Sequence, residues 1–170
     1  VVLYGEPLDE TVVQSAVDAI AGAELGTKES PRSSNNVKYN TWYYGRPVSG
    51  NYPWCMAFVQ WCLHQAGVTP VIRTASCGAL MRAAIRAGAW VTGGYKPGDV
   101  VIYDFPGGAA TDHTGIIESF DGKYVTAIEG KRHGGVLLPG RDSQHGRGGH
   151  PVQLRRVHRR RERRAVLPHG

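Results

Sequence analysis

The stretch NYPWCMAFVQWCLHQAG, residues 51–67, decides the fold that this sequence predicts. After Pro53 and Trp54, apolar residues cover most of the circumference of a helix that stops at Gly67, which predicts a buried central helix. Cys55 stands at the start of this helix. Two interpretations compete for it: a small buried hydrophobic residue, as a cysteine in an apolar helix commonly is, or a nucleophile activated by the helix N-terminus.

Helical patterns also lie on both sides of the central helix. They cover residues 8–26 and 76–88, with Asp9 and Ser76 as the capping residues and a glycine stop at the end of each. The intervening residues 27–53 show no sustained period and are rich in Ser, Asn, Gly, Pro and Tyr. They predict a long ordered loop, and loops of that length inside a compact domain are usually functional.

The pattern then changes to short β-rich runs: DVVIYD (99–104), HTGIIESF (113–120) and KYVTAIE (123–129). Helices followed by strands predict an α+β domain, in which N-terminal helices pack against an antiparallel β-sheet. At 170 residues, the chain is long enough for one such domain.

The last two runs bring a histidine and a carboxylate together. A two-residue turn would put Glu129 and His113 on opposite faces, whereas a three-residue loop of residues 120–122, with Gly122 left-handed, places them directly opposite each other. With Cys55 they then provide the nucleophile, base and orienting carboxylate of a thiol hydrolase. The alternative is a structural cysteine near an ordinary polar pair, and the pattern alone leaves both open.

The three cysteines do not suggest a disulfide scaffold. Cys55 and Cys62 would lie on nearly the same helix face but ~10 Å apart along the axis, so we expect reduced thiols. His64 fits a surface position near the helix end, and the five histidines after residue 130 have irregular spacing that matches no zinc pattern. We therefore expect no metal and no other cofactor.

Charge divides the chain near Gly130. Residues 1–130 hold 9 Lys and Arg against 12 Asp and Glu, a net of −3, while residues 131–170 hold 11 against 2, a net of +9. All fifteen aromatic residues precede the second segment. It is therefore predicted to be a basic tail with three possible origins: an arm that binds nucleic acid, an arm that binds anionic wall polymers, or a frameshifted translation of the domain's final strands.

Four blocks, NYPWCMAFVQWCLHQAG, KPGDVVIYDF, DHTGIIES and YVTAIEG, occur in an order that resembles the CHAP family of papain-like peptidoglycan amidases and endopeptidases. The resemblance is strongest to lytic enzymes of bacteriophages and prophages. It implies a papain-like fold with Cys55 as nucleophile, His113 as general base and Glu129 as orienting acid. Family members commonly carry Asn two residues beyond this acid, where this chain has Lys131.

The resemblance also implies a substrate: an amide in the peptide part of peptidoglycan, either the muramoyl-alanine bond or a link in the stem or cross-bridge. The loop of residues 40–54 would wall the cleft. Its candidate substrate contacts are Trp42, Tyr43, Tyr52 and Trp54. The alternative is that these aromatic side chains only attach the loop to the core.

These observations lead to a prediction for the whole chain. Residues 1–130 form a catalytic domain and residues 131–170 a tail. We expect a monomer that is made in the bacterial cytoplasm, shows no signal peptide or transmembrane segment, and acts on cell-wall peptidoglycan rather than on a specific nucleic acid. The competing prediction is a catalytically impaired module that binds cell walls through the basic tail.

Overall fold

The computed structural model describes residues 10–91, 93–103, 113–132, 134–137 and 151–154. Its helices come first along the chain and its strands follow, so the predicted α+β order is confirmed. The helices of the described part are α1 (Glu10–Ala23), α2 (Lys38–Tyr44), α3 (Cys55–Gln65) and α4 (Cys77–Arg86). The strands are β1 (Trp90–Val91), β2 (Val100–Tyr103), β3 (His113–Phe120), β4 (Val125–Arg132), β5 (Gly135–Leu137) and β6 (Pro151–Leu154).

Within these residues the strands form one sheet in the order β1-β6-β2-β3-β4-β5, and every neighbouring pair is antiparallel. The register of β2 and β3 pairs Tyr103 with His113, so the histidine starts its strand beside a paired neighbour. Strand β3 is therefore held on both sides, by β2 and by β4.

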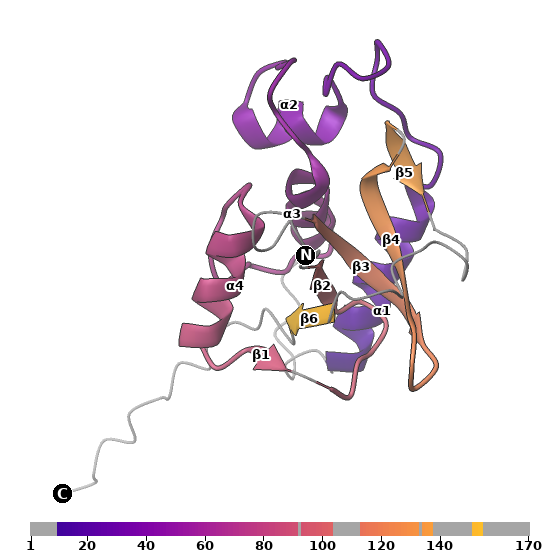
Figure 1. Ribbon diagram of the computed structural model, residues 1–170, viewed down its shortest axis with the longest axis vertical. Coiled ribbons are helices and arrows are strands. Elements are labelled where there is room, and N and C mark those ends of the chain that lie inside the picture. Colours follow the sequence, from indigo (N-terminus) through magenta and orange to yellow (C-terminus); the bar gives the residue numbers. More distant parts are fainter. Residues whose placement is uncertain (1–9, 92, 104–112, 133, 138–150, 155–170) are drawn as a thin grey trace, which may run out of the picture.

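Helix α3 lies near the middle of the molecule, with α2 above it and α4 to its left in Figure 1. The residues from Met56 to Val59 are completely buried, as the apolar pattern predicts for a central helix. Strand β4 comes very close to this helix at Gly130, where an added Cβ would lie 2.8 Å from Cβ of Phe58 and 2.9 Å from Cζ3 of Trp54. A glycine is therefore required where the sheet meets the start of α3.

The predicted ends of α3 and α4 agree with the structure, whereas α1 ends at Ala23, before its predicted glycine stop at residue 26. The Ser76 hydroxyl accepts a hydrogen bond from the Ala79 N–H at 3.2 Å and so caps α4. Gly67 and Gly88 follow α3 and α4 with φ of 72° and 69°, the left-handed conformation that ends helices. The proposed cap of the first helix, Asp9, lies outside the described residues.

The prediction that residues 27–53 form only a loop was wrong, because the segment contains α2. This helix has seven residues, too few to show a helical period in the sequence. Tertiary contacts hold the segment: the buried Asn40 amide donates to the backbone oxygens of Asn35 and Tyr52 at 3.0 and 2.9 Å. The amide therefore ties α2 to the loop segment before it and to the loop segment after it.

Residues beyond Gly130 also contribute to the sheet. Strand β4 continues to Arg132, β5 pairs with it, and β6 lies between β1 and β2. Val136 of β5 is completely buried in the core. The strand prediction missed β1, β5 and β6, which have two, three and four residues and owe their place to pairing with neighbouring strands. The boundary at Gly130 stays a prediction.

Candidate active site

Cys55 is the first residue of α3 and is 8 % exposed. The preceding residue, Trp54, gives the helix no side-chain cap, so side-chain capping does not occupy the first N–H groups of the helix. The Met56 N–H points at the Cys55 sulfur and donates a hydrogen bond to it. A sulfur at this position therefore receives both a direct donor and the positive end of the helix dipole.

His113 and Glu129 contact each other across the β3–β4 hairpin. The distance from Nε2 of His113 to Oε2 of Glu129 is 3.0 Å, and the Glu129 side chain is almost fully buried. The Cys55 sulfur forms a hydrogen bond with the same imidazole. With Nε2 engaged by the carboxylate, Nδ1 is the nitrogen left to face the thiol, so the imidazole links the cysteine to the carboxylate.

The predicted hairpin register was wrong in detail. The loop has four residues, 121–124, because the Asp121 side chain accepts hydrogen bonds from the N–H groups of Lys123 and Tyr124 at 2.9 and 2.7 Å. Gly122 has the expected left-handed φ, 94°. A register shift between Ile117 and Ser119 follows further along the hairpin.

The pairing of Ile116 with Ile128, continued by one position, brings Glu129 opposite Gly115 and diagonal to His113 on the same face. An added Cβ on Gly115 would lie 2.9 Å from Cγ of Glu129. The missing side chain at position 115 leaves the space through which the carboxylate reaches the histidine. His113 and Glu129 therefore meet, although through a different register from the predicted one.

The charges of the cysteine and the histidine support each other. A hydrogen bond from the Cys77 thiol, followed by the hydrogen bond and charge of His113, holds the pKa of Cys55 well below its usual range despite burial. Burial disfavours the imidazolium, but Cys55 and Glu129 outweigh this and raise the pKa of His113 to about 9. The site therefore favours a thiolate next to an imidazolium near neutral pH.

Cys77 is the site residue that the sequence analysis missed. It is the first residue of α4, as Cys55 is of α3, and it is 7 % exposed. The sequence carried a usable signal, because Cys77 directly follows the helix cap Ser76. The sequence alone could not show that the two helix starts converge on one point.

The aromatic residues of α2 and the following loop form a row on the surface. Tyr43 contacts Tyr44 with ring centroids 4.8 Å apart, and Tyr44 contacts Tyr52 at 5.0 Å. Arg73, from the segment before α4, lies 5.2 Å from the Trp42 ring and 4.7 Å from the Tyr43 ring, and it donates to the Tyr43 backbone oxygen. The rings of the row are therefore held by one another and by Arg73.

Trp54 does not belong to this surface, and its prediction as a substrate contact needs correction. Its side chain is completely buried, stacks on Tyr39 with centroids 5.6 Å apart, and donates from Nε1 to Glu29 at 2.9 Å. The apolar body of the indole fills the core while its N–H finds a buried acceptor. Trp54 thus fixes the chain in the core directly before Cys55.

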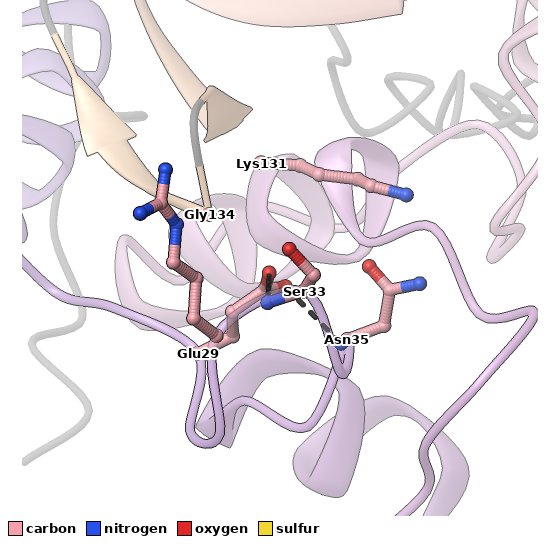
Figure 2. A pocket seen from close by; sticks show the side chains of 6 residues that line it. Glu29, Ser33, Asn35, Lys131 and Gly134 are labelled. Atoms are coloured by element: carbon pink, nitrogen blue, oxygen red, sulfur yellow. Dashed lines mark hydrogen bonds between the residues drawn. The ribbon is translucent and has the colours of Figure 1, made fainter.

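Glu29 organises the neighbouring loop. Its carboxylate also accepts from the N–H groups of Ser33 and Asn35 at 2.6 and 3.2 Å (Figure 2). It lies at the base of a pocket of about 260 Å³. The lining residues are Glu29, Arg32, Ser33, Asn35, Lys131 and Gly134. This pocket contains none of the three candidate catalytic residues, and Lys131 lines it with a left-handed φ of 66°.

The fold and the site geometry are those of the papain-like class, an α+β domain with a cysteine at a helix start beside a strand histidine. Comparison with protein families matches residues 47–131 to the CHAP domain, and this match spans half of the chain. The chain belongs to the CHAP domain family. Searches against curated proteins and against solved structures gave no match.

CHAP domains are in general cysteine- and histidine-dependent amidohydrolases or peptidases. Membership therefore indicates peptidoglycan hydrolase activity in general and action on the cell wall. Across the described residues, we find no helix with the length and apolar character to cross a membrane.

Proposed function

We propose that this protein is a peptidoglycan hydrolase that cleaves an amide of the peptidoglycan peptide with Cys55, His113 and Glu129. The observation that carries the proposal is the set of hydrogen bonds joining these side chains in a chain of the CHAP family. We further propose the bacteriophage or prophage lytic type, acting either as an N-acetylmuramoyl-L-alanine amidase or as an endopeptidase.

In the first step the Cys55 thiolate attacks the amide carbonyl carbon. Backbone N–H groups at the start of α3 can donate to the resulting oxyanion, because no side chain caps them. His113 gives its proton to the leaving amine, and the C–N bond breaks to leave an acyl-enzyme. The neutral imidazole then takes a proton from water, which hydrolyses the thioester and restores the thiolate.

Glu129 supports both steps through His113. Its buried carboxylate holds Nε2, so the other nitrogen stays directed at the sulfur, and its negative charge stabilises the imidazolium. The competing prediction of an impaired binding module required that these three side chains fail to meet. Their contacts do not favour it.

The aromatic row offers the proposed substrate surface. Trp42, Tyr43 and Tyr52 are half-buried, so each keeps an exposed face, and Tyr44 adds a fourth ring at 36 % exposure. Rings held by their neighbours lose little entropy when they contact a ligand. The row is suited to contact the peptide or the sugars next to the scissile amide.

The test is lysis of purified Gram-positive cell walls, followed by turbidity. Wild type should clear the suspension, and Cys55→Ala should not, because the variant removes the sulfur that attacks the amide. Unchanged lysis by the variant would rule out the proposal. Mass spectrometry of the released muropeptides then identifies the bond, since an amidase frees whole stem peptides from muramic acid and an endopeptidase leaves part of each stem attached.

A further inference from the structure

Two cysteine thiols lie in contact at the candidate active site. The Cys77 thiol donates a hydrogen bond to the Cys55 sulfur, and neither cysteine is in a disulfide. Both are the first residues of helices, α3 and α4, so their side chains meet where two helix starts converge. The hydrolytic mechanism uses Cys55 but gives Cys77 no covalent role.

The remaining cysteine in the chain shows how unusual this pair is. Cys62 lies on the same helix as Cys55 but is completely buried, and burial raises the pKa of its thiol. Cys55 and Cys77 are also buried but keep 8 and 7 % of their surface exposed, whereas Cys62 keeps none. Thiolate character and access together determine which cysteines are oxidised.

We propose that Cys55 and Cys77 are a redox pair, in which Cys77 resolves the oxidised form of the nucleophile as an intramolecular disulfide. The proposal rests on Cys55 being the reactive thiolate of the proposed function. The oxidant is a peroxide. The Cys55 sulfur attacks one peroxide oxygen, the O–O bond breaks, and after proton uptake the products are Cys55 sulfenic acid and water.

The Cys77 sulfur then attacks the sulfenic sulfur. The S–S bond forms, the S–O bond breaks, and the leaving hydroxide takes the Cys77 proton to become a second water. Two thiols have lost two electrons and the peroxide has gained them. The disulfide removes the nucleophile and blocks hydrolysis, and a dithiol reductant reverses it by thiol–disulfide exchange.

The fold can accommodate this bond. A disulfide needs the sulfurs about 2.05 Å apart, closer than in a thiol hydrogen bond, so one helix start must shift. Cys77 follows the non-helical segment 68–76 and is buried, as are Leu80 and Ala84 of the same helix. Segment 68–76 carries no helix or strand, so it can absorb the small shift that brings the Cys77 sulfur to Cys55.

The experiment compares wild type, Cys77→Ser, Cys77→Ala and the control Cys62→Ala after treatment with hydrogen peroxide. Remaining thiols are blocked with N-ethylmaleimide and the peptides are mapped by mass spectrometry. Wild type and the control should show a Cys55–Cys77 link and lose hydrolysis that dithiothreitol restores. The Cys77 variants should instead carry Cys55 sulfinic or sulfonic acid, with a loss that dithiothreitol does not restore.

A wild type in which Cys55 reaches sulfinic acid without the link, or pairs with Cys62, would overturn the redox pair. The peptide map detects sulfur chemistry and does not depend on hydrolysis. A protein that forms the link but never clears cell walls would therefore refute the proposed function alone. One that clears walls and never forms the link would refute the redox pair alone.

Discussion

At the scale of single residues, position determines what each cysteine can do. Cys55 and Cys62 belong to the same helix, yet the pKa of Cys55 is lowered by Cys77 and His113 while burial raises that of Cys62. The difference comes from the helix start, where hydrogen-bond donors surround one sulfur, and the apolar core, where desolvation penalises a charge on the other.

Alkylation tests this contrast. Cys55 should react with iodoacetamide at neutral pH with an apparent pKa below that of a free cysteine, and Cys62 should lag far behind. Cys77→Ala should raise the apparent pKa of Cys55, because the variant removes the thiol that donates to it. The measurement is the pH dependence of the alkylation rate, read peptide by peptide. Equal rates at Cys55 and Cys62 would show that Cys55 is not activated.

Glu129→Gln tests the orienting role. The amide keeps the shape of the side chain but loses the charge that stabilises the imidazolium, so kcat should fall by about a hundredfold or more while KM changes little. Steady-state kinetics on a soluble muropeptide separates the two constants. A variant that raises KM and leaves kcat intact would assign Glu129 to substrate binding.

Hydrolysis should depend on pH through His113. The folded-state pKa of about 9 lies above the ordinary value of 6.5, so the imidazolium persists to about pH 9 and its proton is lost above that pH. We therefore expect kcat/KM to decline as pH rises through about 9. Because the pKa is raised on folding, protonated His113 also stabilises the folded state. This stabilisation is complete below pH 6.5 and is lost as the pH rises through about 9. An alkaline limit near 6.5 would contradict the ion pair.

At the scale of elements, the site depends on how closely β4 approaches α3. Gly130 directly follows Glu129 in the chain. It packs on Phe58 and on Trp54, and Trp54 is the residue directly before Cys55. The carboxylate and the nucleophile are therefore positioned by one helix–strand contact. Glu29 strengthens this contact from the loop side by holding the Trp54 indole.

Gly130→Ala should disturb that contact. The added methyl would meet Phe58 at 2.8 Å, and overpacking of this kind costs about 1–3 kcal/mol. Thermal unfolding should show a lower Tm, and wall lysis should fall because Glu129 and Cys55 move apart. The matched control is Gly93→Ala, where a Cβ meets no atom within 4 Å. Equal Tm values for the two variants would mean that β4 does not pack tightly on α3.

At the scale of the whole molecule, the sheet is completed by residues from the basic tail. Strand β6 lies between β1 and β2, and Val136 of β5 is part of the core. If residues 1–130 formed the catalytic domain without the tail, β2 would lose its pairing with β6 and would have an unpaired edge. Resequencing the coding DNA tests the separate hypothesis of a frameshift.

Truncation tests the sufficiency of residues 1–130. A chain ending at Gly130 loses β5 and β6 and should unfold at a lower denaturant concentration than the full chain. A chain ending at Leu154 keeps both strands and should unfold near the full-length midpoint. Urea unfolding followed by tryptophan fluorescence measures both. A chain ending at Gly130 that is as stable as the full chain would show that the core is complete before the tail.

Local signals in the sequence were enough for the α+β class, the central helix, the cap at Ser76 and the placing of His113 and Glu129 on neighbouring strands, because helical period, capping residues and strand alternation act between near neighbours. The hairpin register was not predictable, since the Asp121 side chain and the β-bulge set it. Neither was the burial of Trp54 or the contact of Cys77 with Cys55. These depend on how distant segments pack, and a pattern along the chain carries no information on which helix starts converge.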